Sequence, residues 1–353
     1  NEHEILTSLT KLETVPNVTN FIDEGNFLVL ELEHFSGEAL DSILTQQLFT
    51  QEDSVAVISS CLKTLDAIHK LHIIHKDIKP SNILWDKETN KVWLIDFGVT
   101  IRFNQKLDQF HQPTSVSGSL SYMPPEQTGR INRFIDYRSD YYSLGVTFYQ
   151  LLTGRLPFNK AETTHDFLYQ LLSTEAIAPH VITSSVSKSL SDIVIHLLEK
   201  DPENRYQSIL GISHDLSCYQ QALPFVIAEK DSPGHFSIPS NVYGRNSELS
   251  QLQEIFSKVK AGSQEYVLID GYSGVGKTAL VNELYRDINN AKGFLIEGKF
   301  DQLQRQAPLF GFIKAFNEFF SAILTESDTT LTHWKTLIEH NLGENIGVVT
   351  QHI

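Results

Sequence analysis

Apolar residues recur at a helical spacing over several long segments of the chain, and residues 51–71 form the clearest of these. Thr50, followed three residues later by Asp53, is a capping box that predicts the start of this helix. The apolar face of the helix consists of Val55, Ile58, Cys61, Leu62, Leu65 and Ile68. His69 and His72 follow near its end, where we expect both side chains to lie on or near the surface.

The same helical period predicts most of the elements in the first part of the chain. The predicted helices cover residues 2–12, 39–44, 137–152, 163–174, 189–199 and 208–221. Two short apolar runs, Phe27–Leu32 and Val92–Ile95, are typical of buried strands instead. Residues 99–123 contain few aliphatic and many polar side chains, which indicates a long flexible loop. We therefore expect an α+β domain, mostly α-helical with a few strands, over residues 1–221.

The hydrophobic pattern weakens over residues 222–241, which include three prolines and a glycine and are typical of a linker. Beyond this linker, strands and helices alternate in the predicted order. The predicted helices cover residues 249–259, 278–289 and 308–324, and the predicted strands cover residues 266–270 and 294–297. This alternation predicts an α/β domain over residues 242–353.

The composition supports two globular domains and excludes some classes of partner. The chain has 353 residues, of which 41% are hydrophobic, and a formal net charge of −15. This acidic balance argues against a nucleic-acid-binding protein. No run of eighteen apolar residues and no basic-then-apolar leader is present, so we expect no membrane span and a cytoplasmic location. Cys61 and Cys218 are far apart in the sequence and are expected to be reduced thiols.

The segment Ile74–Leu84 carries the residues with the clearest chemistry. Asp77 can take a proton from a hydroxyl group, Lys79 can neutralise a phosphate, and Asn82 can bind a metal ion. Nineteen residues after Asp77, Asp96 follows an apolar strand and offers a second metal ligand. The simplest alternative is a polar turn between two strands. Together, the two segments resemble the catalytic loop and the DFG turn of the protein kinase fold.

The resemblance to protein kinases covers residues 1–221 and implies specific roles. Asp77 would orient the acceptor hydroxyl and accept its proton, and Lys79 would contact the transferred phosphate. Asn82 and Asp96 would hold Mg²⁺ against the phosphates of ATP. Ser119 matches the hydroxyl that serine/threonine kinases keep near the catalytic base. The resemblance therefore implies ATP and Mg²⁺ as cofactors and a serine or threonine of a protein as the acceptor.

Other positions of the resemblance are structural. Glu126 would form a buried ion pair with Arg205, and Asp140 would anchor the backbone of the catalytic loop. Two residues differ from the family pattern, since Pro124 replaces an alanine and Lys76 replaces the usual arginine before Asp77. Because a lysine binds a phosphate with less geometric specificity than an arginine, activation by phosphorylation of the loop is placed in doubt.

The expected nucleotide pocket is only partly represented. Glu2, or alternatively Glu4, aligns with the helix glutamate that pairs with the ATP-binding lysine, although a solvated glutamate is the simpler interpretation. Leu30 and Leu32 lie where the hinge would bind adenine, and Glu38 where a ribose contact would be. No glycine-rich loop and no lysine-bearing strand precede Glu2. We therefore expect a largely missing small lobe, a chain cut at both ends, and negligible kinase activity from this fragment alone.

A second nucleotide site is predicted at Gly271–Thr278, which fits the phosphate-binding P-loop in full. Backbone N–H groups around Gly271, Gly274 and Gly276 would surround the phosphates. Lys277 would neutralise them, and Thr278 would bind Mg²⁺. A glycine turn without function is the simpler alternative. No acidic Walker B segment follows within residues 279–353, so this domain is also expected to be incomplete.

Two features together indicate a narrower group. Residues 126–138 and the fused ATPase resemble large bacterial and fungal hybrid proteins, in which a serine/threonine-kinase-like domain precedes a signalling ATPase of the AAA or STAND type. Such a parent would carry sensor and histidine-kinase domains as further partners. Two hypotheses follow: a serine/threonine kinase coupled to an ATPase, or a pseudokinase scaffold joined to a nucleotide-gated ATPase switch. The kinase hypothesis is favoured because Asp77, Lys79, Asn82 and Asp96 are all present.

Overall fold

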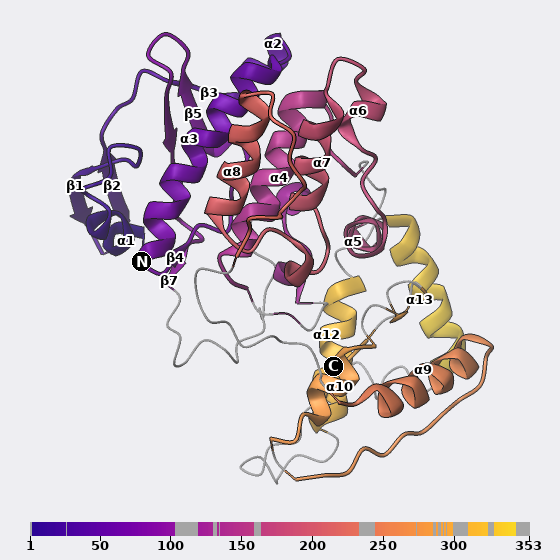
Figure 1. Ribbon diagram of the computed structural model, residues 1–353. Helices are drawn as coiled ribbons and strands as arrows, with labels where there is room; N and C mark the ends of the chain where they lie inside the picture. The colour runs from indigo at the N-terminus through magenta and orange to yellow at the C-terminus, as the bar shows by residue number, and fades with distance from the viewer. Residues whose placement is uncertain are drawn as a thin grey trace. The chain divides into compact units, whose positions relative to one another are not determined.

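The chain divides into two units in the computed structural model shown in Figure 1. One consists of Asn1–Phe158 and Glu175–Asn241, and the other of Asn159–Thr174 and Val242–Ile353. The structure describes residues 2–25, 27–102, 119–129, 133, 135–158, 164–232, 244–272, 274–284, 287, 288, 291, 293, 295–298, 310–323 and 328–343.

Helix α3 (Gln51–Lys70) lies in the core of the first unit. The Thr50 hydroxyl accepts a hydrogen bond from the Asp53 N–H group (3.0 Å), which confirms the predicted start of the helix. All six predicted apolar positions of α3 are buried. This face contacts α4 (Arg138–Thr153), α8 (Ile209–Gln220), β4 (Ile73–Ile74) and β6 (Lys91–Leu94).

Helix α4 is almost completely enclosed, because 15 of its 16 residues are buried. It contacts α3, α6 (Pro179–Ile182) and α7 (Lys188–Leu197). Gly145 allows α4 and α7 to approach closely, since a Cβ atom at this position would lie 2.7 Å from the Leu197 Cβ atom. The predicted helices at residues 137–152 and 189–199 are therefore confirmed, whereas α6 was not predicted.

The described part of the first unit also contains the shorter helices α1 (Glu2–Ser8) and α2 (Leu40–Gln46). Its 3₁₀ turns are η1 (Pro80–Asn82), η3 (Leu120–Tyr122), η4 (Pro125–Thr128) and η5 (Pro202–Asn204).

Short antiparallel strands frame the segments that carry the chemistry. Strands β3 (Glu38–Ala39), β5 (Ile83–Asp86) and β6 form one sheet in that order, and β4 pairs with β7 (Ile101–Arg102). Residues 75–82 connect β4 to β5, and residues 95–100 connect β6 to β7. Because β5 pairs with β6 and β4 with β7, the two connections are held side by side at both ends.

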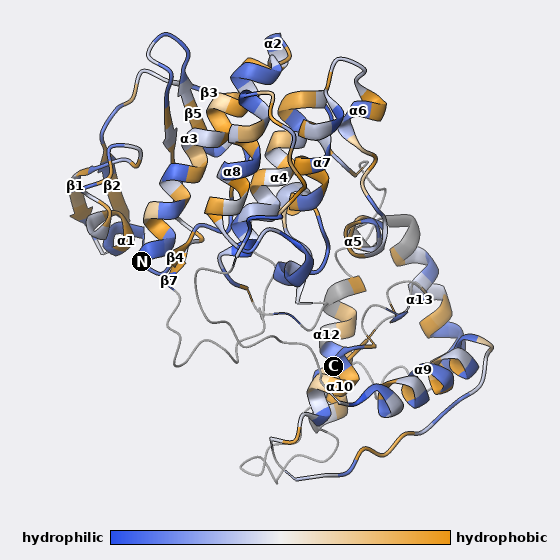
Figure 2. Cartoon of the chain, viewed as in Figure 1, coloured by the Kyte–Doolittle hydropathy of each residue, from blue (hydrophilic) through white to orange (hydrophobic). Residues whose placement is uncertain are grey.

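Strand β2 (Leu28–Leu32) forms where a strand was predicted, but the expectation that it is buried was wrong. It pairs with β1 (Val18–Asp23) in an isolated two-stranded sheet, and Leu28 is 71% exposed. A strand is buried only when other layers cover both of its faces. Among the described residues, α1 alone contacts this hairpin closely. Figure 2 shows its apolar residues in orange.

The second unit contains helices but none of the expected strands within its described residues. Its helices are α5 (Thr164–Ser173), α9 (Asn246–Lys260), α10 (Lys277–Asn282), α12 (Phe310–Ile323) and α13 (Asp328–Leu342). The predicted strand at 266–270 was wrong, because Tyr266 and Leu268 are 95% and 94% exposed and make no ladder. Residues 295–297, part of the other predicted strand, also lack pairing. A strand needs a neighbouring backbone, and no neighbour is found among the described residues.

No helix in the described part of the chain is both long enough and apolar enough to cross a membrane.

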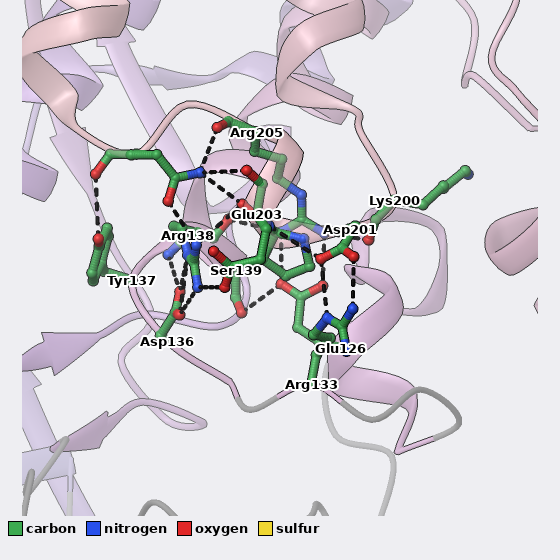
Figure 3. Close-up of polar contacts among 12 residues, drawn as sticks. Glu126, Arg133, Asp136, Tyr137, Arg138, Ser139, Lys200, Asp201, Glu203 and Arg205 are labelled. Atoms are coloured by element: carbon green, nitrogen blue, oxygen red, sulfur yellow. Dashed lines mark hydrogen bonds and ion pairs between the residues drawn. The ribbon is translucent and has the colours of Figure 1, made fainter. Parts of the chain in front are cut away.

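Glu126 and Arg205 form the predicted ion pair, and both side chains are fully buried. The guanidinium group donates to both carboxylate oxygens at 2.7 Å (Figure 3). Its other N–H groups donate to the backbone carbonyls of Glu199, Arg138 and Lys200. The charges of Glu126 and Arg205 are therefore both compensated, which is the condition under which a buried ion pair persists.

Two further arginines near this pair bind carboxylates. Arg133 donates to both oxygens of Asp201, at 3.0 and 2.7 Å. Arg138 donates to Asp136 and Glu203, as Figure 3 shows. The start of α4 is thereby connected to η5.

Replacing Glu126 with Gln should lower the free energy of unfolding by about 3–5 kcal/mol, because the Arg205 charge would remain buried without a counter-ion. The measurement is the urea midpoint of unfolding at neutral pH. Asp192→Asn is the matched control, since the Lys188–Asp192 pair (2.6 Å) is largely exposed. This control should change stability by less than about 1 kcal/mol. Equal effects of the two variants would contradict the role assigned to burial.

Candidate active site

Four of the predicted site residues meet around the Asp77 carboxylate. Its Oδ2 atom accepts hydrogen bonds from Lys79 Nζ (2.5 Å) and Asn82 Nδ2 (3.1 Å). Its Oδ1 atom accepts from the Ser119 N–H group (3.0 Å). Lys79 Nζ also donates to the Ser119 hydroxyl (2.9 Å), so the ammonium group bridges the carboxylate and the hydroxyl. Segments forty residues apart thus form one polar cluster.

The Asp77 carboxylate is ionised and fixed in direction. Burial alone would raise the pKa of Asp77, but the hydrogen bonds from Lys79 and from the Ser119 backbone, with the Lys79 charge, hold it below its usual value. The side chain is 7% exposed. An oriented carboxylate beside an ammonium group can accept a proton from a hydroxyl and neutralise an incoming phosphate oxygen.

Asp140 holds the loop that carries Asp77 from behind. Its Oδ2 atom accepts from the His75 N–H group (3.0 Å), and its Oδ1 atom accepts from the Lys76 N–H group (2.8 Å). Lys76 has a left-handed backbone with φ 69°, which a lysine adopts at a cost in free energy. The anchoring role expected of Asp140 is confirmed by these contacts. They fix the backbone immediately before Asp77.

His69 is a functional neighbour that the sequence interpretation missed. It was expected at the surface, but its Nε2 atom lies 2.7 Å from Asp140 Oδ2 and its side chain is only 9% exposed. Burial is the largest single effect and would raise the pKa of Asp140, but the hydrogen bond from His69, together with the neighbouring charges and the Lys76 N–H group, holds this pKa below its usual value. His69 lies four residues after Leu65 on the buried face of α3, and this spacing was the available signal. His72, in contrast, is exposed as expected.

His75 connects the two chemistry-bearing segments. Its Nδ1 atom accepts from the Asp77 N–H group (3.3 Å), so Nε2 carries the proton and donates to the Ile95 carbonyl (3.2 Å). Burial lowers the pKa of His75, so the ring is neutral at physiological pH. It also meets the Phe97 ring edge to face, with centroids 4.8 Å apart.

Asp96 and Glu2 form a second cluster at the turn after β6. Asp96 has φ 64° and is exposed, and its Oδ1 atom accepts from the Gly98 N–H group (3.2 Å). Glu2 Oε1 accepts from the Phe97 N–H group (3.2 Å). The solvated-glutamate alternative for Glu2 is therefore wrong, because its carboxylate binds the backbone of this turn.

Asn82 has its amide group oriented as a metal ligand requires. Its Nδ2 atom donates to the backbone carbonyl (2.9 Å) and the carboxylate of Asp77. Its Oδ1 atom accepts one long hydrogen bond from the Ser81 hydroxyl (3.5 Å) and has a second lone pair for a cation. The Asn82 carbonyl accepts from the Ile95 N–H group (2.9 Å), one residue before Asp96. Oxygen donors of this kind fit Mg²⁺, which retains several waters and needs few protein ligands. No group of three His, Cys, Asp or Glu residues suited to a metal occurs in the described part of the chain.

The predicted adenine and ribose contacts do not join these clusters. Leu30 and Leu32 pair with Phe21 and Val18 in the hairpin of β1 and β2. Glu38 Oε1 instead accepts from Gln46 Nε2 (3.1 Å). Their proposed roles in nucleotide binding remain predictions.

The P-loop residues adopt the backbone that only glycine readily takes. Gly271, Gly274 and Gly276 have φ values of 154°, 83° and 89°. Lys277 Nζ folds back onto the loop and donates to the carbonyls of Gly271 (2.6 Å) and Tyr272 (2.9 Å). Thr278 follows in the first turn of α10 and is exposed. Ser273 of the predicted P-loop lies outside the described residues, as do residues 103–118 of the predicted loop at 99–123.

Comparison with known proteins identifies two kinds of domain. A protein kinase domain matches residues 1–216, and an AAA ATPase domain matches residues 241–351. A hybrid signal transduction histidine kinase G of Dictyostelium discoideum is 32% identical over 259 residues, which cover 66% of this chain and 8% of that protein. A probable serine/threonine-protein kinase of Clostridium perfringens is 32% identical over 244 residues, covering 66% of this chain and 34% of that protein. The serine/threonine-protein kinase PknB of Mycobacterium tuberculosis is 33% identical over 193 residues, covering 54% and 30%. The chain thus spans between 8% and 34% of the length of these relatives.

Asp140→Asn should destabilise the protein at neutral pH, and the effect should shrink in acid. The folded pKa of Asp140 is depressed, so its stabilisation is present above the unfolded pKa of about 4 and is lost as the pH falls through the folded value. Urea unfolding of both forms at pH 7 and pH 3.5 measures the difference. Asp192→Asn is the control, with a small and nearly constant effect. A difference that is the same at both pH values would show that the Asp140 charge is not what stabilises the loop.

Proposed function

Since the chain belongs to the protein kinase family, whose domain matches residues 1–216, we propose that this domain transfers the γ-phosphoryl group of ATP to a serine or threonine of a protein. The observation that carries the proposal is the Asp77 carboxylate held by Lys79, Asn82 and the Ser119 N–H group. The two relatives named as serine/threonine-protein kinases support the acceptor class.

The proposed roles follow from the contacts of each group. Asp77 accepts the proton of the acceptor hydroxyl, because its carboxylate is ionised and oriented. Lys79 moves its ammonium group from Asp77 and Ser119 toward the transferred phosphate. The Ser119 hydroxyl positions Lys79 and the acceptor side chain. Catalysis then rests on positioning and charge neutralisation rather than on covalent chemistry by the protein.

Asn82 and Asp96 are proposed to hold Mg²⁺ with the phosphates of ATP. The cation would neutralise the phosphate charge as transfer proceeds. Glu2 would hold the turn at Phe97 and orient the ATP-binding lysine of the complete site. The contact of Glu2 with the Phe97 N–H group favours Glu2 over Glu4 for this role. The backbone of Leu30 and Leu32 is proposed to bind adenine, and Glu38 the ribose.

We further propose that residues 242–353 bind and hydrolyse ATP, since an AAA ATPase domain matches residues 241–351. Lys277 would exchange its loop carbonyls for phosphate oxygens, Thr278 would bind Mg²⁺, and Gly271, Gly274 and Gly276 would keep the backbone open to the phosphates. The proposed domain limits are 1–221 and 242–353. The relative named as a hybrid histidine kinase supports a signal-transduction protein with further sensor and histidine-kinase domains.

Asp77→Asn in the full-length protein should reduce phosphate transfer by about 10²–10⁴-fold, because the amide cannot accept the hydroxyl proton. Transfer is measured as incorporation of labelled phosphate from ATP into serine and threonine of a protein acceptor. Affinity for ATP should change little.

Asp66→Asn is the matched control, because Asp66 pairs with the exposed Lys70 on the outer side of α3. It should leave transfer unchanged. If Asp77→Asn also leaves transfer unchanged, or the native protein transfers none, the domain serves instead as a pseudokinase scaffold.

Lys277→Ala should abolish ATP hydrolysis by the second domain and leave phosphate transfer through Asp77 measurable. The lysine is the one cation on the P-loop sequence Gly271–Thr278. Phosphate release in the Asp77→Asn background isolates this activity. Lys260→Ala, at the end of α9, is the control and should hydrolyse ATP at the native rate. Hydrolysis that survives Lys277→Ala would contradict the P-loop assignment.

A further inference from the structure

The segment that follows α8 is not free of the first unit. The kinase domain match ends at residue 216 and the ATPase match begins at residue 241, so neither domain accounts for the residues between them. The sequence pattern predicted a linker from residue 222. Instead, α8 ends at Gln220, and Ala222, two residues later, has φ 53°. The chain continues through turns in which the Glu229 N–H group binds the Val226 carbonyl (3.2 Å) and the Asp231 N–H group binds the Ala228 carbonyl (3.0 Å).

Asp231 binds the first turn of α8. Its Oδ1 atom accepts from the Ser208 hydroxyl (2.6 Å), and its Oδ2 atom accepts from the Gln207 N–H group. Ser208 is also the N-cap of α8, since its hydroxyl accepts from the Gly211 N–H group (3.0 Å). The carboxylate therefore lies at the helix end where the backbone dipole favours a negative charge.

A second carboxylate holds the same segment from the side of α8. Asp215 is 1% exposed, and its Oδ2 atom accepts from the Tyr206 hydroxyl (2.7 Å) and from the Ala228 N–H group (2.9 Å). Ala228 has φ 58°, a conformation that alanine adopts only when its surroundings impose it. The bond to a buried carboxylate supplies that constraint.

Gly211 makes room for Asp231. It lies within α8, where alanine would be the better helix former and no unusual backbone angle requires glycine. A Cβ atom at this position would lie 2.6 Å from both the Cβ and the Cγ atoms of Asp231. The missing side chain is therefore explained by the docked aspartate and by nothing in the helix itself.

We propose that residues 222–232 are an intramolecular latch, docked on α8 through Asp231 and Asp215, that sets where the connection to the ATPase domain leaves the kinase domain. When the latch is closed, the connection consists of residues 233–244, which can reach about 40 Å at full extension. When the latch is open, the connection begins at residue 222 and can reach about 80 Å. Lengthening a connection in this way lowers the effective concentration of one domain at the other by roughly threefold. The latch thereby limits the reach of the chain between α8 and α9.

Gly211→Ala and Asp231→Ala test the latch by hydrogen exchange of the full protein. Both variants should raise the exchange rates of the Ala228 and Asp231 amides at least tenfold, while the amides of α3 exchange as in the native protein. Glu229→Ala is the matched control, because this exposed side chain lies on the same segment, and it should leave exchange unchanged.

Native protection of the Ala228 amide in both variants would overturn the proposal, as would exchange that rises equally in α3. Should Gly211→Ala fail to fold, Asp231→Ala decides alone. The reach is measured as the distance distribution between spin labels at Lys188→Cys and Glu254→Cys in a Cys218→Ser background. The distribution should broaden toward longer distances in Asp231→Ala, and an unchanged distribution would refute the effect on reach.

Discussion

One buried carboxylate, that of Asp140, determines the position of the candidate catalytic residues. It accepts hydrogen bonds from the backbone N–H groups of His75 and Lys76 and from the ring of His69, and it is not exposed to solvent. An ionised carboxylate is stable in such a place only because three donors converge on it. In return, it fixes a backbone with a left-handed residue at Lys76, and Asp77 follows directly. The geometry of the site is therefore a consequence of the packing of α4.

Three consecutive residues in the first turn of α4 each bind a different segment of the domain. Arg138 binds Asp136 and Glu203, the Ser139 hydroxyl donates to Glu126 (2.8 Å), and Asp140 holds the loop before Asp77. Successive residues of a helix point about 100° apart, so one turn can reach three surrounding segments. Because Glu126 in turn binds Arg205, the core, the ion pair and the candidate site form one connected network. Loss of any residue of this network would change the positions of the others.

How much the sequence predicts depends on whether the signal is local. The capping box at Thr50, the helical periods and the spacing of Asp77, Lys79 and Asn82 are local, and the structure has the elements and the cluster that they indicate. His69 was misjudged because its partner is 71 residues away. Three other outcomes also depend on distant parts of the chain: the exposure of Leu28, the missing pairing at residues 266–270 and the docking of Asp231. Asp231 has partners far away in the sequence, whereas the other two segments lack covering or pairing partners among the described residues. A short window of sequence contains neither kind of information.

The two candidate nucleotide sites are built on different physical principles. Around Asp77, direction is imposed by buried charges whose partners come from distant segments, so the site exists only when the core is packed. Around Lys277, the glycine φ values and two carbonyls of the same loop set the geometry, and the ammonium group is bound within six residues of its own position. A loop of that kind can rearrange around an anion at little cost, because few contacts outside it must change. The geometry of the first site is thus coupled to the stability of its domain, whereas the geometry of the second depends on contacts within its own loop.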